Sequence, residues 1–464
     1  MTSEPRRIAV VGGGITGLAA ARALLAQPQA HLRPQRHDVV LFEASTRIGG
    51  KILTSPFAGH AAIDEGADAF LARLPWGSEL ARAVGIGEQL VSPAAASAAV
   101  WWDGLHPIPE ALLLGMPTEV LALARSGLLT WSGKLRAASE PLRPRTSTAS
   151  DSLGAFVRAR FGNQVHLRLV DSLIGSIYAA DTDRFSLAAV PQIADLAASA
   201  RSVLLAGRKA RARSTATTGP IFYAPVGGMG ALTSATAAAV SGAGGDLRTN
   251  APVDELAADG RRWRVNGEHF DAVILACPAA ATARLLSSVA PDASRALVNI
   301  PTADVAIATL AITATDWPRR HFKLSGYLVP KPKQQLVTAV SFGSQKWTHW
   351  QLPGAVVLRV SLGRDGLPVL HLSDDQLTAT AIDEVGSHLG LALQPAHVRI
   401  SRWPAAFPQY RPHHATLVAT ASSALPGGLV LAGASYHGIG VPACIRSGEQ
   451  AADAVSRFHE SLAD

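Results

Sequence analysis

The fold is decided by a stretch near the N-terminus, RIAVVGGGITG, which runs from Arg7 to Gly17. Its first five residues are mostly β-branched or small and predict a short buried strand. The next six match the pattern G-x-G-x-x-G, and Leu18, Ala21 and Leu25 then recur at helical spacing. A strand, a tight glycine turn and a helix in this order predict the start of a nucleotide-binding βαβ unit.

The glycines of this turn have different tasks. Gly12 permits the tight turn, Gly14 lets the backbone approach a pyrophosphate, and Gly17 allows the helix to pack closely on the strand. A second predicted strand, VVLFE, ends on Glu43, where a carboxylate can accept hydrogen bonds from ribose hydroxyls. This context indicates dinucleotide binding.

Composition limits the remaining choices. With 464 residues the chain is longer than one core usually serves, so we expect about two or three domains. The hydrophobic content of 48% and charged content of 17% exclude wholesale disorder. The net charge of +7 favours anionic partners, although an arginine-rich codon bias explains it equally well. Cys277 and Cys444 lie far apart, which offers no metal-ligand spacing and fits a reducing cytosol.

The residues after Glu43 favour FAD over NAD. They read ASTRIGGK, from Ala44 to Lys51. An arginine followed by a glycine pair just after the ribose-binding acid resembles the second fingerprint of the amine oxidase-like flavoproteins. The resemblance implies that Arg47 and the backbone of Gly49 and Gly50 lie beside the phosphates.

Further blocks resemble the protoporphyrinogen and coproporphyrinogen oxidases within that superfamily. They are IDEGADAFLAR from Ile63 to Arg73, LHPIP from Leu105 to Pro109, GMPT from Gly115 to Thr118, APVGGM from Ala224 to Met229, Pro252-Val253, and LAGASYHGIGVP from Leu431 to Pro442. The blocks span nearly the whole chain. They are specific for the family and less so for the substrate.

The resemblance implies non-covalent FAD, O2 as electron acceptor, and a porphyrinogen that loses six hydrogens over three flavin turnovers, with release of H2O2. It implies a site for FAD formed by Gly12, Gly13, Gly14, Ile15, Thr16, Gly17, Glu43, Ala44, Arg47, Gly49, Gly50, Lys51, Gly66, Ala67, Asp68, Ala69, Val253, Trp403, Ile439, Gly440 and Val441. No catalytic side chain and no metal are expected, because the flavin is the oxidant.

Arg73 is the expected contact for a substrate propionate, since a guanidinium can donate two parallel hydrogen bonds to a carboxylate. Some relatives carry further basic residues here, where this chain has Leu74 and Pro75. His437, in the closing block, is expected to be a hydrogen-bonding spacer rather than an acid or base.

We expect an α/β fold with a discontinuous Rossmann-like FAD-binding domain, a mixed-sheet substrate domain and a mostly helical insertion. The expected ranges are 1–66, 218–299 and 404–464 for the first, 67–92 and 300–403 for the second, and 93–217 for the third. Later strands are expected near Val265, Ile274, Ile307, Leu358 and Leu431, from their apolar or alternating runs.

The leading hypothesis is a cytoplasmic oxidase that converts coproporphyrinogen III to coproporphyrin III in haem biosynthesis. Its expected partners are the porphyrinogen and O2; contact with the next enzyme of the pathway and peripheral contact with a membrane stay open, and no nucleic acid is expected. The alternatives are a protoporphyrinogen IX oxidase, another amine oxidase-like flavoprotein, and a non-catalytic porphyrin carrier.

Overall fold

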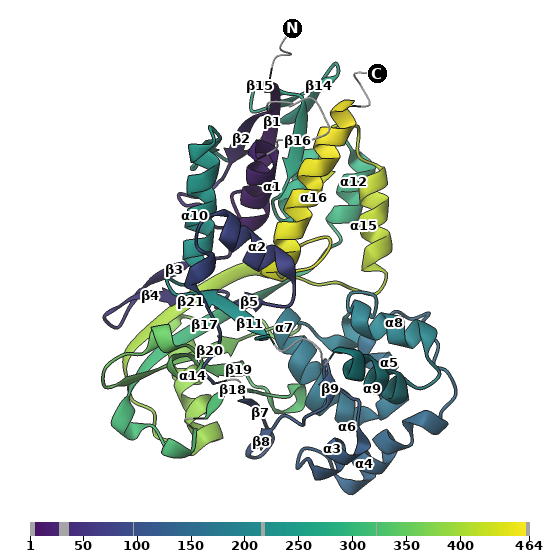
Figure 1. Ribbon diagram of the computed structural model, residues 1–464, viewed down its shortest axis with the longest axis vertical. Coiled ribbons are helices and arrows are strands. Elements are labelled where there is room, and N and C mark those ends of the chain that lie inside the picture. Colours follow the sequence, from purple (N-terminus) through teal and green to yellow (C-terminus); the bar gives the residue numbers. More distant parts are fainter. Residues whose placement is uncertain (1–4, 27–36, 96, 215–218, 322, 461–464) are drawn as a thin grey trace.

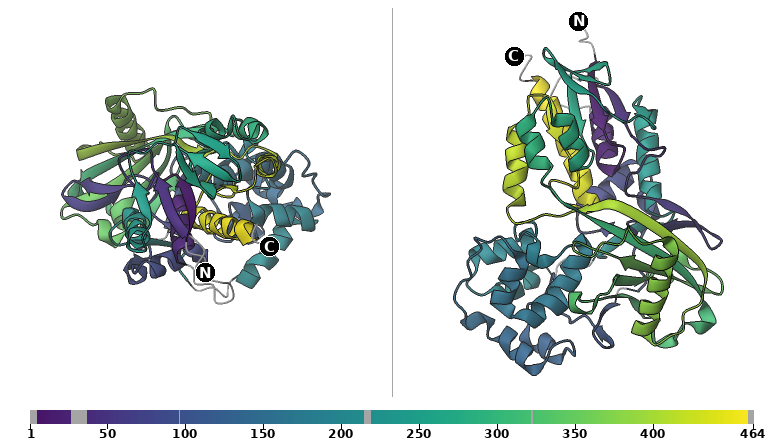
Figure 2. Two further views of the ribbon diagram at one scale, coloured as in Figure 1. Left: turned by 90° about the horizontal axis from the view of Figure 1, so that it is seen from above. Right: turned by 180° about the vertical axis from the view of Figure 1, so that it is seen from behind.

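The computed structural model describes residues 5–26, 37–95, 97–214, 219–321 and 323–460. A parallel sheet with helices against it forms the upper half of the molecule in Figure 1. A second sheet and a group of helices lie side by side below it, as the view from behind in Figure 2 also shows. The α/β class with a mixed second sheet is confirmed.

The upper sheet has five parallel strands in the order β12-β2-β1-β16-β22. The strands are β1 (Arg6–Val11), β2 (His37–Phe42), β12 (Asp246–Arg248), β16 (Ala272–Leu275) and β22 (Leu429–Leu431). The predicted first and second strands therefore pair side by side, and the predicted strands near Ile274 and Leu431 complete the sheet. The glycine turn leads into α1 (Ile15–Leu25), as predicted.

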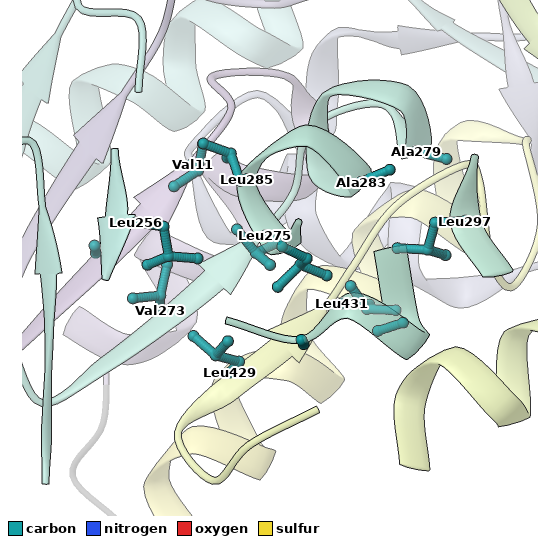
Figure 3. Close-up of a cluster of buried hydrophobic side chains, with 14 of the residues drawn as sticks. Val11, Leu256, Val273, Leu275, Ala279, Ala283, Leu285, Leu297, Leu429 and Leu431 are labelled. Carbon is teal, nitrogen blue, oxygen red and sulfur yellow. The ribbon is translucent and has the colours of Figure 1, made fainter. Parts of the chain in front are cut away.

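Alternate residues of β1 enter two separate cores. Ile8 and Val10 pack with residues of α1, α10 (Met229–Gly242) and α16 (Val441–Glu460). Ala9 and Val11 face a second layer, which Figure 3 shows around Leu275 and Leu431. That layer contains β13 (Leu256–Asp259), β14 (Arg262–Val265), β15 (Glu268–Phe270), α11 (Ala279–Leu286), α12 (Pro291–Leu297) and α15 (His414–Ser423). Burial on both faces explains why this strand is continuously apolar.

The lower sheet has seven strands in the order β21-β17-β20-β19-β18-β7-β8. The strands are β7 (Ser97–Trp101), β8 (Leu105–Pro107), β17 (Thr302–Thr313), β18 (Leu324–Leu328), β19 (Val337–Phe342), β20 (Ala355–Leu362) and β21 (Pro395–Pro408). Neighbours are antiparallel except β7 and β18. One face of this sheet packs on α14 (Asp374–Leu389). On the opposite face, part of the sheet packs in a small cluster around Trp347 and Trp350, and the rest lines a cavity.

The helices of the predicted insertion begin later than residue 93. They are α3 (Val120–Arg125), α4 (Trp131–Ala138), α5 (Leu153–Phe161), α6 (Asn163–Val165), a π-helix (His166–Gly175), α7 (Ser176–Tyr178), α8 (Pro191–Ser199) and α9 (Val203–Ser214). The first part of the range instead supplies β7 and β8 to the lower sheet. The sequence could not reveal this, because β7 pairs with β18 more than 200 residues away, with Ala99 opposite Tyr327.

Several short elements complete the fold. They are the hairpin of β3 (Thr54–Phe57) and β4 (His60–Asp64), the small sheet of β5 (Phe70–Leu71), β11 (Phe222–Pro225) and β6 (Leu90–Val91), the pair β9 (Leu112–Leu113) and β10 (Met116–Pro117), and the helices α2 (Pro75–Ala83) and α13 (Gly343–Lys346). None of the helices in the described part of the chain is both long and apolar enough to cross a membrane.

Candidate active site

A cavity of about 1190 Å³ extends from the glycine turn of the upper sheet to the free face of the lower sheet. Gly12, Gly14 and Glu43 line its upper end, while Ile307 and Leu328 line its lower end. The upper end lies at the carboxyl ends of β1 and β2, where open α/β sheets bind their ligands. Its volume exceeds the several hundred Å³ that holds one ordinary small ligand. The cavity therefore has room for a large cofactor together with a substrate.

In the glycine turn, a side chain would have room only at Gly14, which lines the cavity. Gly12 has φ +114°, and a Cβ there would lie 2.8 Å from Ala276 O. A Cβ on Gly17 would overlap Gly12 O, so helix and turn are in direct contact. At Gly14, by contrast, the nearest neighbour of such a Cβ would be Gly50 Cα at 4.0 Å. No side chain of the described residues caps α1, so the N–H groups of its first turn can bind an anion.

Glu43 is fixed at the end of β2. Its Oε2 accepts a hydrogen bond from Gly13 N at 2.8 Å, and its Oε1 accepts bonds from Ser45 N at 2.8 Å and Ser45 Oγ at 2.7 Å. These bonds orient the carboxylate at the cavity wall beside the turn. A fixed carboxylate here can accept hydrogen bonds from the hydroxyl groups of a ribose.

The second glycine pair lies directly against the first turn. Gly49 N donates to Gly13 O at 2.9 Å. The Arg47 guanidinium donates to Ile52 O at 3.1 Å and to Gly50 O at 2.6 Å. Arg47 does not itself line the cavity; its bonds hold in place the backbone of Gly49 and Gly50, which does.

The loop Gly66–Asp68 lines the cavity and is held by side chains of α13, of Trp347 and of β20. Asp68 Oδ2 accepts bonds from Lys346 Nζ at 2.8 Å and Trp347 Nε1 at 3.1 Å, and lies 3.6 Å from Arg359 Nη1. Arg359 also donates to Gly66 O. Burial favours the neutral form of Asp68, but Lys346 and Arg359 outweigh it and hold its pKa well below the usual range. Asp68 is therefore a carboxylate at neutral pH.

Lys51 ties the glycine turns to the lower sheet. Its Nζ donates to Ala405 O at 2.9 Å and to Ala406 O at 2.6 Å. Ala405 has φ +47°, a left-handed backbone conformation that is costly for alanine. Asp304 Oδ1 accepts a bond from Ala405 N at 2.7 Å, so contacts on both sides fix this irregular part of β21.

The structure brings most of the predicted cofactor residues to the cavity wall. Those that line it are Gly12, Gly14, Ile15, Thr16, Glu43, Ala44, Gly49, Gly50, Lys51, Gly66, Ala67, Asp68, Val253, Trp403, Ile439 and Val441. The predicted residues outside the lining are Gly13, Gly17, Arg47, Ala69, Gly440 and Arg73. Gly13, Gly17 and Arg47 instead shape the turns that do line it.

Arg73 and His437 both lie outside the lining of the main cavity. Arg73 is exposed and lies outside the lining, although its neighbour Leu71 pairs with Phe222, which does line the cavity. His437 lines a second, smaller pocket between α15, β22 and α16. His437 therefore lines this second pocket and not the main cavity.

Sequence reasoning missed Lys346 and Arg359, the two cations at the lower end of the cavity. A signal for Arg359 was present, because it is the one charged residue in the apolar run VVLRVSL. A charge in the middle of a buried strand is costly unless it has a partner, so such a residue marks a site. The partner, Asp68, lies 291 residues earlier and could not be read from the local pattern.

Comparisons with known proteins agree with this geometry. The family model for flavin-containing amine oxidoreductases matches residues 15–456. The coproporphyrinogen III oxidase of Mycobacterium tuberculosis is 35% identical, covering 97% of each chain, and that of Bacillus subtilis is 29% identical, covering 97% of this chain and 98% of its own. A crystal structure from Exiguobacterium, named provisionally as a protoporphyrinogen oxidase, is 29% identical, with a TM-score of 0.83 over 99% of this chain and 100% of that one.

The residues at the upper end fit FAD. The open surface of Gly14 and the uncapped start of α1 suit a pyrophosphate, and Glu43 suits the ribose next to it. Val253 lines the same end, where an adenine would extend, and Trp403 lies near Gly66 at the middle of the cavity. An extended dinucleotide can therefore span from the glycine turn to the lower sheet.

Proposed function

The chain belongs to the flavin-containing amine oxidoreductases and is an FAD-dependent oxidoreductase, and we propose that it oxidises coproporphyrinogen III to coproporphyrin III in haem biosynthesis. The observation that carries this proposal is the continuous cavity, which joins a dinucleotide site to a large wall of the lower sheet. Similarity to the coproporphyrinogen III oxidases over nearly the whole chain supports the choice of substrate.

The lower wall suits a macrocycle. It is formed mainly by apolar or small side chains, including Val305, Ile307, Leu328, Ala339 and Phe407. An apolar wall excludes water and packs against the faces of a flat or puckered tetrapyrrole. Among the described residues of this lower wall, charged side chains occur only at and beside Asp68.

The protein's part in this chemistry is to bind, orient and exclude water. FAD, when bound, would supply the oxidising power for removal of hydride from the substrate. The lower sheet holds the macrocycle against the loop Gly66–Asp68, and no side chain is assigned a covalent step. Arg73, which is exposed, contributes a further contact to a propionate, close to the strand pair of Leu71 and Phe222. O2 as the final acceptor, with release of H2O2, is part of the proposal.

The proposal includes the division of the chain by task. Residues 1–66, 218–299 and 404–464 hold FAD, residues 67–92 and 300–403 bind substrate together with β7 and β8, and the remaining helices of 93–217 close the cavity from the side. The boundary at 217/218 lies outside the described residues. A cytoplasmic location, with porphyrin passed to the next enzyme of the pathway, completes the proposal.

The test is to supply coproporphyrinogen III and protoporphyrinogen IX to the purified FAD-loaded protein in air and follow porphyrin fluorescence. We expect faster oxidation of coproporphyrinogen III, with H2O2 formed. A preference for protoporphyrinogen IX would overturn the substrate assignment. Under anaerobic conditions, binding of coproporphyrinogen III without loss of the oxidised flavin spectrum would indicate a carrier instead.

A further inference from the structure

The charged residues of the lower half of the cavity form one group. Among the described lining residues from the loop Gly66–Asp68, β17 to β21 and α13, only Asp68, Lys346 and Arg359 are charged. Asp64, a buried carboxyl behind the cavity wall, interacts with the charges of both Arg359 and Asp68, so the group is not simply two cations against one anion. What distinguishes Lys346 and Arg359 is that both line the cavity, whereas Asp64 does not.

The group also has more hydrogen-bond donors than acceptors. Lys346 has three N–H groups and, among the described residues, donates to Asp68 Oδ2. Arg359 has five and donates to Gly66 O, while its Nε is buried without a partner. Buried donors without partners destabilise a protein. A ligand with acceptor oxygens would therefore be stabilised at this position.

A hydroxyl group lies beside the two cations. Ser341 on β19 stands directly opposite Arg359 on β20, a position at which Cβ atoms are about 5 Å apart. Ser341 lines the cavity, and its Oγ is buried without a partner among the described residues. A serine hydroxyl can rotate, so it can donate a hydrogen bond to a ligand in the cavity. Lys346 follows closely after the end of β19, in α13.

We propose that Lys346, Arg359 and Ser341 form a subsite for one propionate carboxylate of the porphyrinogen. Asp68 positions the two cations, and the incoming carboxylate accepts hydrogen bonds from the donors that have no other partner. This subsite rests on the proposed function, because it assumes a tetrapyrrole with carboxylate side chains. It differs from the contact expected of Arg73, which is exposed and therefore screened by water.

The test measures binding of coproporphyrin III and of its tetramethyl ester to the FAD-loaded protein by fluorescence titration. The ester has the same macrocycle without carboxylates. For Lys346→Met we expect the Kd of the free acid to rise about 10- to 100-fold, the worth of one charge-assisted hydrogen bond, while the Kd of the ester stays constant. Lys346→Arg should keep most of the wild-type affinity.

The matched control for the lysine is Lys333→Met. Lys333 Nζ lies 2.6 Å from Asp103 Oδ1 and 5.1 Å from the Trp102 ring, and Lys346 likewise pairs with Asp68 and lies 5.1 Å from the Trp347 ring. Lys333 is outside the cavity lining, so its variant should bind both porphyrins like the wild type.

A second pair of variants distinguishes loss of the subsite from misfolding of the protein. Ser341→Ala should weaken binding of the free acid several-fold, whereas Ser325→Ala should not, because Ser325 Oγ already donates to Ser97 O at 2.9 Å.

Equal losses of acid and ester binding in Lys346→Met, together with loss of FAD, would show that the group only holds the loop Gly66–Asp68 and would overturn the subsite. Unchanged acid binding in both Lys346→Met and Ser341→Ala would overturn it too. Failure of the wild type to oxidise coproporphyrinogen III would instead refute the proposed function.

Discussion

The guanidinium of Arg364 lies against the carboxylate of Asp171 in a two-point contact, with Nη1 3.0 Å from Oδ2 and Nη2 3.1 Å from Oδ1. Both side chains are buried, and Thr182 donates two further bonds to Asp171 Oδ1. Arg364 also donates to Ala180 O. Since Asp171 belongs to the π-helix and Arg364 follows β20, this pair joins the helical part to the lower sheet.

Arg364→Met should destabilise the protein by about 3 to 5 kcal/mol, because it leaves the buried Asp171 carboxylate without its counter-charge. The free energy of unfolding can be measured by urea denaturation followed by circular dichroism. The double variant Arg364→Met with Asp171→Asn should recover part of the loss, since the uncompensated charge is removed. A double variant as unstable as the single one would show that packing rather than charge determines the effect.

Glu43→Ala should weaken FAD binding about 10- to 100-fold, the worth of a charge-assisted hydrogen bond to the ribose. The Kd follows from quenching of flavin fluorescence when FAD is added to the apoprotein. Glu88→Ala is the control, because Glu88 is exposed and lies outside the cavity lining. Equal FAD affinity for wild type and Glu43→Ala would exclude a contact between Glu43 and the cofactor.

Gly17→Ala should abolish FAD retention and lower the melting temperature, since the added methyl group would overlap Gly12 O and force the helix away from the turn. Gly242→Ala is the matched control: no atom lies within 4 Å of a Cβ there, and it ends α10. Replacing a helical glycine by alanine there should raise stability by up to about 1 kcal/mol. Differential scanning fluorimetry and the ratio of flavin to protein absorbance test both changes. A Gly17→Ala variant that is yellow and stable would contradict the tight turn.

Asp64 should make stability depend on pH. Burial raises its pKa to about 6, against the hydrogen bond from Thr54 and the charge of Arg359, which lower it. The carboxyl is thus harder to ionise in the folded protein than in the unfolded chain, where its pKa is about 3.9. Its ionisation costs stability above pH 6, and this cost is lost as the pH falls through 6 toward 4.

The difference in unfolding free energy between wild type and Asp64→Asn isolates this effect. Relative to the variant, the wild type should gain about 1 kcal/mol between pH 7.5 and pH 5. The asparagine oxygen can still accept the bond from Met229 N, which is 2.8 Å long in the wild type. Parallel pH profiles for the two proteins would show that Asp64 does not titrate in this range.

Arg73→Ala should raise the KM for coproporphyrinogen III only about 2- to 5-fold, because an exposed ion pair is worth less than about 1 kcal/mol. The kcat should not change, since Arg73 lies outside the cavity lining. Steady-state fluorescence assays give both constants, and Arg82→Ala, another exposed arginine on the neighbouring helix α2, is the control. A KM equal to that of the wild type would remove Arg73 from the substrate contacts.

The nucleotide-binding unit was predictable because its determinants are local. The strand, the turn and the helix of residues 7–25 follow from β-branched content, from glycines where a side chain would clash, and from apolar spacing. The predicted strands near Val265, Ile307 and Leu358 are also confirmed, as β14, β17 and β20. Such patterns are complete within a few consecutive residues, so they can be recognised from the sequence alone.

The residue at which the helical part begins, and the grouping of Asp68, Lys346 and Arg359 in the cavity, were not predictable in this way. Whether Ser97–Trp101 becomes a strand of the lower sheet depends on a partner strand that lies far along the chain. Hydrophobic periodicity records which face of an element is buried, but it does not record what that face meets.

By itself, the sequence determined the cofactor unit, because it depends on a short motif with its own steric and electrostatic reason. It also indicated the family, through resemblance to known proteins, and it predicted the residues around the dinucleotide. Only the tertiary structure decided that Asp68 meets Lys346 and Arg359 and that Arg73 stays at the surface. The physical reason is that a buried charge needs a partner at a few ångströms, and folding alone brings together residues nearly 300 positions apart.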